Sequence, residues 1–308
     1  MELVSGMVAF VRAAEARSFT RAARELGVTP SGVGKAIGRL EAELGVRLLH
    51  RTTRRVALTD DGAVFLEHCR RVLDEIDEAR AVIAHRSGAP RGRLRVSMPS
   101  FLALRHVLPA LSAFTRDNAD VRLDVGLSDR RVNLAEEGVD VAVRVGELVD
   151  SSLVAVRLGA MQIVTVATPA LAAELGIESL GDLAVSPCAA FKLPSTGRER
   201  PWAFTIDGRA VEWSPRAPIV VDGGEGMVAV AMAGVAVTQV PHGMAAEALA
   251  SGALVEVLAP LRPAPLPIHA VHLAGRRVSP RTRAFLDFLA GLDWPLAPRP
   301  RAKRTRSP

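Results

Sequence analysis

The chain has 308 residues, of which 49% are apolar, so it is long enough for two or three packed domains. The formal net charge of +6 is concentrated in the last ten residues, which hold five bases and no acid and are expected to form a disordered tail. Two distant cysteines, Cys69 and Cys188, argue against a disulfide framework or a zinc site. With no export signal and no apolar run of roughly 18 residues, the sequence predicts a cytoplasmic protein without membrane contact.

The chain begins with a predicted amphipathic helix over residues 2–16. Ser18 follows as the N-cap of a second helix, and Gly27 ends that helix where the chain must turn. Ala23 is small enough to let two helices touch, and Val33 lies six residues after Gly27, so the spacing predicts a helix-turn-helix. A plain helical hairpin with a glycine turn is the alternative.

The second helix of this unit is predicted to begin with Thr29 as its cap and Pro30 in its first turn. Val28 is expected to fill the angle between the two helices. Three apolar residues should hold the second helix against the first: Val33, Ile37 and Leu40.

Residues 46–59 are predicted to form a β-wing beside this helix, with Leu48 and Leu49 packed inward and Val56 and Leu58 alternating along a strand. The wing tip carries several arginines, which could contact phosphates or the minor groove. From Arg17 to Arg55 nine bases face only three acids, a charge pattern suited to the phosphate backbone of DNA.

A further helix is predicted to open at residues 59–62. Its apolar residues recur at alternating spacings of four and three, which is typical of a coiled coil, and we predict a dimer through it. Packing of this helix on its own domain is the alternative, and Cys69 is expected in a core rather than as a redox switch. The predicted dimer seam consists of Phe65, Cys69, Val72, Ile76, Ala79 and Ile83.

With these features in place, the chain resembles the LysR-type transcriptional regulators. The resemblance rests on FTRAAREL at 19–26, TPSGV at 29–33, IGRLEAELG at 37–45 and LLHRTTR at 48–54. It continues in RLRV at 93–96, LAEEGVDVAVRVG at 134–146 and AGVAV at 233–237, and covers about residues 1–294. It implies a sequence-specific, DNA-binding transcriptional regulator, a homodimer or homotetramer, controlled by a small-molecule effector. No cofactor and no enzymatic activity are implied.

The predicted recognition helix departs from the family in carrying Gly32, Gly34 and Gly38 where alanine or serine is more usual. Each glycine costs about 1 kcal/mol of helix propensity, and Gly34 lacks a hydroxyl that could contact DNA. Three residues are therefore the preferred base contacts: Ser31, Lys35 and Arg39. The full set of predicted DNA-binding residues is Ser18, Thr20, Thr29, Pro30, Ser31, Gly34, Lys35, Arg39, Arg51, Thr52, Thr53, Arg54 and Arg55.

The second half of the chain alternates strands and helices, which predicts an α/β domain with a mainly parallel sheet. Strands are expected near 93–97, 121–127, 141–145, 163–167, 218–221, 235–239 and 268–273. Helices are expected near 101–116, 131–137, 169–175, 224–234 and 279–290. The resemblance adds two subdomains like those of periplasmic solute-binding proteins, with a ligand cleft between them.

Ligands of such folds lie beside the carboxyl ends of strands and the N-termini of helices. Open backbone N–H groups at the Gly-Gly pair 223–224 would suit a carboxylate, and anionic metabolites are the usual effectors of the resembled family. Asp222 could instead cap its helix, Arg144 could serve structure, and Lys192 could simply face solvent. The predicted effector residues are Ser100, Phe101, Ser128, Arg144, Gly146, Lys192, Ser195, Asp222 and Gly223.

The predicted fold is an N-terminal all-α winged helix-turn-helix with a long coiled-coil linker helix, followed by a two-subdomain α/β sensor. The expected boundaries are 1–59 for DNA binding, 60–88 for the linker, 89–294 for the effector domain (91–161 plus 267–294, and 162–266) and 295–308 for the tail. An enzyme is disfavoured because no catalytic or nucleotide-binding motif is found. The predicted helix-turn-helix disfavours a transport-type solute-binding protein. The paired α/β pattern disfavours a DNA-binding regulator without ligand control.

Overall fold

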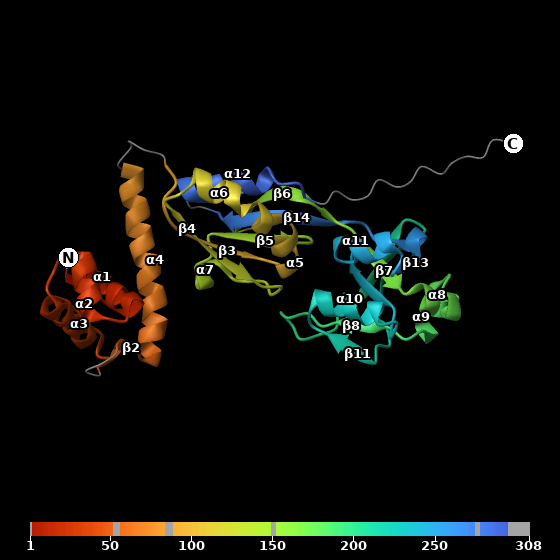
Figure 1. Cartoon of the computed structure of the whole chain (residues 1–308), viewed down its shortest axis with the longest axis horizontal. Coiled ribbons are helices and arrows are strands. Elements are labelled where there is room, and N and C mark those ends of the chain that lie inside the picture. Colours follow the sequence, from red (N-terminus) through yellow and green to blue (C-terminus); the bar gives the residue numbers. More distant parts are fainter. Residues whose placement is uncertain (1, 52–55, 84–88, 149–151, 275–277, 295–308) are drawn as a thin grey trace. The chain divides into compact units, whose positions relative to one another are not determined.

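The fold is described from a computed structural model of the chain, which covers residues 2–51, 56–83, 89–148, 152–274 and 278–294. Within these ranges the side chains at 2, 51, 74–75 and 77–83 are not described. The chain divides into two compact units, residues 1–89 and 90–308, each of which is treated by itself below (Figure 1).

The first unit is a helical domain with a small β-wing. Its two strands pair in antiparallel fashion, with Leu49 opposite Leu58. In chain order its elements are α1 (Glu2–Ala16), α2 (Phe19–Leu26), α3 (Pro30–Leu44), β1 (Leu49–Arg51), β2 (Val56–Leu58) and α4 (Asp60–Ile83).

The helix ends of this unit form as the sequence predicts. Ser18 Oγ accepts a hydrogen bond from the backbone N–H of Arg21 at 3.3 Å and so caps α2. Gly27 ends α2 with φ of 66°, a left-handed conformation that favours glycine. Thr29 caps α3 through a 3.1 Å bond from the Gly32 N–H, and Pro30 occupies the first turn. The helix-turn-helix is therefore fixed by its own local hydrogen bonds.

The core of the first unit lies between α1, α2, α3 and the wing. Val33, Ile37 and Leu40 are buried in it, as predicted, together with Leu48 and Leu49 of the wing. The expectation for Val28 is wrong, because its side chain is 52% exposed. Val28 directly follows the left-handed turn and its N–H bonds to the Ala23 carbonyl at 3.0 Å. The angle between the helices is filled instead by two buried small residues, Ala22 and Ala23.

A buried carboxylate ties α3 to the wing. One oxygen of Glu41, Oε1, accepts the backbone N–H groups of Leu48 at 2.9 Å and Leu49 at 3.2 Å, and the side chain is buried. These are the residues that lead into β1, so Glu41 satisfies two donors that would otherwise be buried without partners. The link holds the wing at a defined place relative to α3.

The first half of α4 packs on its own domain, which corrects the predicted dimer seam at Phe65 and Cys69. Cys69 is fully buried in the core of the first unit, and Phe65 packs on Phe10 with ring centroids 5.8 Å apart. The first two seam residues are thus used within the domain, because α4 must cover the apolar face of α1. Of the remaining seam residues Val72 is 41% exposed and Ile76 is half-buried, while the side chains of Ala79 and Ile83 lie outside the described residues.

The second unit contains two lobes. The first lobe has a five-stranded sheet in the order β4-β3-β5-β14-β6, with α6 and α12 lying side by side on one face (Figure 1). Phe114 of α6 and Phe285 of α12 pack edge to face there, with ring centroids 5.3 Å apart. Its strands are β3 (Gly92–Met98), β4 (Val121–Leu127), β5 (Val141–Val145), β6 (Leu153–Met161) and β14 (Leu266–Leu273). Its helical segments are α5 (Ser100–Leu102), η1 (Ala103–Val107), η2 (Leu108–Ala110), α6 (Leu111–Asp117), α7 (Leu134–Glu137) and α12 (Pro280–Ala290).

The second lobe is formed by residues between β6 and β14. One sheet has the order β12-β7-β13, and β8 and β11 pair in parallel beside it, while β9 and β10 form a hairpin. The strands are β7 (Ile163–Ala167), β8 (Ala189–Phe191), β9 (Trp202–Ile206), β10 (Arg209–Trp213), β11 (Ile219–Val221), β12 (Thr238–Pro241) and β13 (Val255–Val257). The helices are α8 (Pro169–Leu175), α9 (Leu180–Val185), α10 (Gly224–Met232), α11 (His242–Ser251) and η3 (Ala259–Leu261).

The expectation of a mainly parallel sheet is wrong, because the sheet of the first lobe is mixed and the three-stranded sheet of the second lobe is antiparallel. In the first lobe β3 pairs in parallel with β4 and β5, but β14 runs antiparallel to both β5 and β6. The antiparallel pairs arise because β14 returns from the second lobe and inserts between two strands of the first. In the second lobe β12 and β13 are both antiparallel to β7.

Among the helices that the structure describes, none combines the length and apolar composition needed to cross a bilayer.

Candidate functional site

The exposed face of α3 presents polar side chains beside the helix N-terminus. Ser31, Lys35 and Arg39 are exposed and follow one another at intervals of four residues, so they share one side of the helix, opposite the buried Val33 and Leu40. The hydroxyls of Thr29 and Ser31 lie 3.1 Å apart at the first turn. A helix that presents hydroxyls at its first turn and a lysine one turn further on can contact phosphates and base edges in a major groove.

Other predicted DNA-binding residues surround this face. Thr20 is exposed in α2, and Ser18 is half-buried in its capping role. Pro30 is exposed, and a Cβ added to Gly34 would meet no atom within 4 Å, so packing does not require glycine there. The backbone of Arg51 ends β1, but its side chain is not described. Four further wing residues lie outside the described residues and stay predictions: Thr52, Thr53, Arg54 and Arg55.

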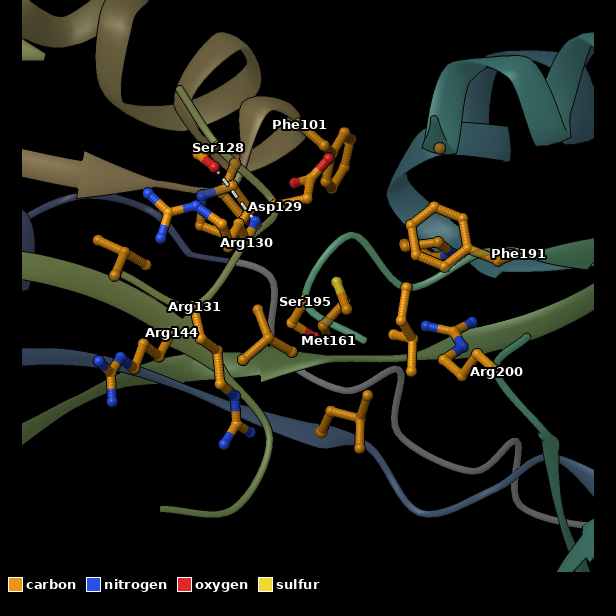
Figure 2. A pocket seen from close by; sticks show the side chains of 18 of the residues that line it. Phe101, Ser128, Asp129, Arg130, Arg131, Arg144, Met161, Phe191, Ser195 and Arg200 are labelled. Carbon is orange, nitrogen blue, oxygen red and sulfur yellow. Dashed lines mark hydrogen bonds between the residues drawn. The ribbon is translucent and has the colours of Figure 1, made fainter. Parts of the chain in front are cut away.

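A cavity of about 310 Å³ lies in the second unit, with walls from both lobes. The first lobe contributes segments that follow β3 and β4 together with β5, and the second lobe contributes residues around β8, α10 and β12. Figure 2 shows Phe101, Ser128 and Arg144 on one side and Phe191 and Arg200 on the other. A cleft at the ends of sheet strands is the usual ligand site in folds of this kind.

Four of the nine predicted effector residues line this cavity: Phe101, Ser128, Arg144 and Ser195. Ser100, Gly146, Lys192, Asp222 and Gly223 do not line it. Gly146, with φ of 94°, ends β5 and donates its N–H to the Pro267 carbonyl, and Gly223 precedes α10 as its N-cap. The side chain of Lys192 is exposed because neighbouring residues in an extended segment point to opposite sides.

Several lining residues were not expected from the sequence. They include the charged residues Asp129, Arg131 and Arg200, and the apolar residues Met161, Phe191, Met227 and Met244. No local motif marks them, since they come from separate segments that only the tertiary fold brings together. Gln239 also lines the cavity, where its amide bonds both backbone groups of Ala203, at 3.0 Å and 2.9 Å, and so holds β9 in place.

The cavity wall is rich in arginine. Arg130 makes a two-point ion pair with Glu137 at 2.9 Å and 2.5 Å, and this pair lowers the pKa of the Glu137 carboxyl. Arg144 donates from Nη2 to the Val132 carbonyl at 2.7 Å. Partial burial raises the pKa of Asp129, with a smaller contribution in the same direction from the charge of Glu225. Four arginines against one aspartate make the lining suitable for an anionic ligand.

Within the described ranges no group of three or more His, Cys, Asp or Glu side chains is arranged to hold a metal ion.

Both cysteines are buried, and burial raises the pKa of the Cys69 and Cys188 thiols to about 11. The thiolate is the reactive form, so at pH 8 only about one thiol in a thousand is ionised. We expect the native protein to resist alkylation by iodoacetamide at pH 8, and both thiols to react once the protein is unfolded in urea. Mass spectrometry after timed quenching measures this, and stoichiometric labelling of the native protein at the rate of a free thiol would contradict it.

Two family models match the chain. Residues 5–63 match the bacterial regulatory helix-turn-helix of the lysR family, and residues 87–293 match the LysR substrate binding domain. A transcriptional regulator from Xanthomonas campestris is 34% identical over 284 residues, which cover 91% of this chain and 82% of that protein. A transcriptional repressor from Pseudomonas aeruginosa is 33% identical, with coverage of 95% and 92%.

Solved structures agree with these matches. CrgA, a LysR-type transcriptional regulator from Neisseria meningitidis, superposes with a TM-score of 0.57 at 31% identity, covering 93% of this chain and 97% of that one. Full-length AphB, a virulence activator from Vibrio cholerae, gives a TM-score of 0.60 at 26% identity, with coverage of 93% and 98%. The winged helix-turn-helix, the two-lobed second unit and these similarities lead to one assignment: the chain belongs to the LysR family of transcriptional regulators.

Proposed function

We propose that this regulator binds an operator as a homodimer or a dimer of dimers, and that a small anionic molecule in the cavity of the second unit controls that binding. The observation that carries the proposal is the cavity itself, enclosed by both lobes and lined by four arginines. A ligand that bridges two lobes favours one lobe arrangement over another, and only such differential binding shifts an equilibrium. The resulting change in the spacing or angle of the DNA-binding domains would alter operator affinity.

The DNA contacts proposed are those of the exposed α3 face, with Ser31, Lys35 and Arg39 as the base-reading residues and the wing arginines as phosphate contacts. For the dimer we propose the outer face of α4, where Val72 and Ile76 remain available after Phe65 and Cys69 are used in the domain core. Because the operator lies on the chromosome, we place the protein in the cytoplasm.

Replacing both Ser31 and Lys35 by alanine is expected to abolish specific operator binding while the protein stays folded, because both side chains are exposed. Each well-placed base contact is worth about 1–3 kcal/mol, so the double variant should lose roughly 30-fold or more in specific affinity. Gel-shift titrations with the upstream region of its own gene, at several salt concentrations, measure this against a scrambled duplex.

A matched control is Arg24→Ala, which removes an exposed base from α2, outside the proposed reading face. It should leave the ratio of specific to scrambled binding within about threefold, since a phosphate contact acts uniformly across sequences. If the Ser31 and Lys35 double variant keeps its specific affinity, α3 is not the helix that recognises the operator sequence.

A further inference from the structure

The segment between β8 and β9, residues 191–200, forms a preformed wall of the cavity. Its backbone is closed by three bonds of 2.8 Å, from the N–H of Leu193 to Arg198 O, of Gly197 to Leu193 O and of Arg200 to Phe191 O. Four residues of this segment line the cavity: Phe191, Leu193, Ser195 and Arg200. These bonds hold the backbone that carries the four side chains in place without a ligand.

Arg200 is the charged side chain of this wall, and it lacks a counter-ion among the described residues. Its guanidinium lies over the ring of Phe191, with the central carbon 5.5 Å from the ring centroid. Among the described residues no carboxylate lies within ion-pair distance of it, and its burial lowers the pKa of the guanidinium. Removing a charge from water without a counter-ion costs free energy, which an anion in the cavity would offset.

The other cavity arginines are in a different position. Arg130 is neutralised by Glu137, and Arg144 is bonded to the Val132 carbonyl. Arg131 is exposed, so solvent already stabilises its charge. Arg200 is therefore the half-buried cation of the cavity that has no protein counter-ion among the described residues, and a bound anion would stabilise it most.

Much of the cavity wall that the second lobe contributes is apolar, with Ser195 and Gln239 as polar members. Met161, Phe191, Met227 and Met244 line the cavity, and Phe101 reaches from the first lobe toward α11, where a Cβ on Gly243 would lie 2.8 Å from its ring. Methionine and phenylalanine favour a ring or a compact hydrocarbon body, since sulfur and aromatic edges pack well on a ring face. Figure 2 shows Phe191 and Arg200 on the same side of the cavity, Met161 beside Ser195 in the middle, and Asp129 beside Phe101, away from Arg200.

We infer that the effector is a carboxylate carried on an apolar body about the size of one ring, with its carboxylate paired to Arg200 and its body against Phe191 and the methionines. The inference rests on the proposed effector function of this cavity and adds the ligand class and the anchoring residue. A planar guanidinium presents two parallel N–H donors that match a carboxylate.

Calorimetric titration of the full-length protein tests this with a panel of phenyl- and cyclohexyl-substituted carboxylates that carry one to three methylenes. Each acid is compared with its own neutral amide, and succinate serves as an anion without an apolar body. We expect at least one ring-bearing acid to bind, and its amide to bind about 10- to 100-fold more weakly, since a charge-assisted hydrogen bond is lost. Equal binding of acid and amide, or failure of every ring-bearing acid, would overturn the inference.

Substitutions at Arg200 show whether this residue binds the ligand or only stabilises the fold. Arg200→Gln should weaken the acid about 10- to 100-fold and leave the amide unchanged, and Arg200→Lys should fall between, because it keeps charge but loses the two-point geometry. The Tm of ligand-free Arg200→Gln should stay close to that of the wild type or exceed it, since a half-buried charge without a counter-ion is removed. Arg198→Gln, which changes an exposed arginine of the same segment that does not line the cavity, is the matched control and should change affinity less than threefold. A drop in Tm with no change in acid affinity would assign Arg200 a purely structural role.

The substitution Ser195→Trp distinguishes two outcomes. Either the cavity is not the effector site, or it is the effector site but Arg200 does not anchor the ligand. Ser195 is exposed and lines the cavity, so a tryptophan there fills the cavity without disturbing a core. It should abolish binding of every ligand in the panel. If Ser195→Trp leaves binding intact, ligands do not use the cavity and the proposed effector site fails. If it blocks binding while Arg200→Gln does not distinguish acid from amide, only the inference about Arg200 fails.

Discussion

Substitution of Gly62 by alanine is expected to destabilise the first unit by about 3 kcal/mol or more. Gly62 lies in the first turn of α4, where its N–H bonds to the Thr59 hydroxyl at 2.9 Å. A Cβ at this position would collide with the backbone carbonyl of Leu48, which leads into the wing. Backbone cannot rotate away as a side chain can, so either the wing or the start of α4 must move.

Gly34→Ala is the matched control, a glycine-to-alanine change in the same unit. A Cβ at Gly34 meets nothing within 4 Å and its φ is not positive, so the change should stabilise α3 by up to about 1 kcal/mol. Urea unfolding followed by circular dichroism at 222 nm compares both variants with the wild type. An unchanged or raised midpoint for Gly62→Ala would show that the close contact at Gly62 is not made.

Glu41→Ala is expected to cost about 3 kcal/mol of folding free energy and to reduce operator binding together with it. The substitution leaves the N–H groups of Leu48 and Leu49 buried without an acceptor, at about 1–3 kcal/mol for each group. Because the wing then loses its link to α3, specific DNA affinity should fall even at temperatures where the protein is folded.

Glu41→Gln separates the hydrogen bonds from the charge. Its side-chain carbonyl can still accept both N–H groups through one oxygen, so it should recover more than half of the lost stability. The same urea titrations and gel shifts measure it. If the glutamine variant is as unstable as the alanine variant, then the charge of Glu41, and not its acceptor oxygen, stabilises the domain.

The sequence predicted the first unit well because its signals are local. Ser18, Gly27 and Thr29 each act within four residues, through caps and a left-handed turn, and the structure has all three in those roles. Val28 was misjudged because the direction of a turn residue depends on how two helices cross. The prediction of a dimer seam on α4 was wrong in part for a similar reason. Apolar residues that alternate at spacings of four and three can pack on a second subunit or on the same domain, and the spacing does not distinguish the two.

The second unit was harder because its sheets are completed by distant segments. The strand β14 inserts between β5 and β6 after more than 100 residues of intervening chain, and no local signal announces the direction of that pairing. The strands β6, β9, β10 and β13 were not expected at all. Arg200 and Phe191 lay outside every motif for the same reason, while Ser128 and Arg144 were found because they follow or end strands that the sequence does show.

The late return of β14 and α12 also bears on how the chain is made. During synthesis the second lobe, residues 162–265, is complete in sequence before β14 and α12 leave the ribosome, whereas the first lobe still lacks a central strand and a covering helix. At about 5–20 residues per second this interval lasts a few seconds, during which β5 and β6 have an unfilled gap between them. Nascent chains that are stalled before residue 266 should therefore recruit chaperones, and release of the last 40 or so residues should be the step that ends this exposure.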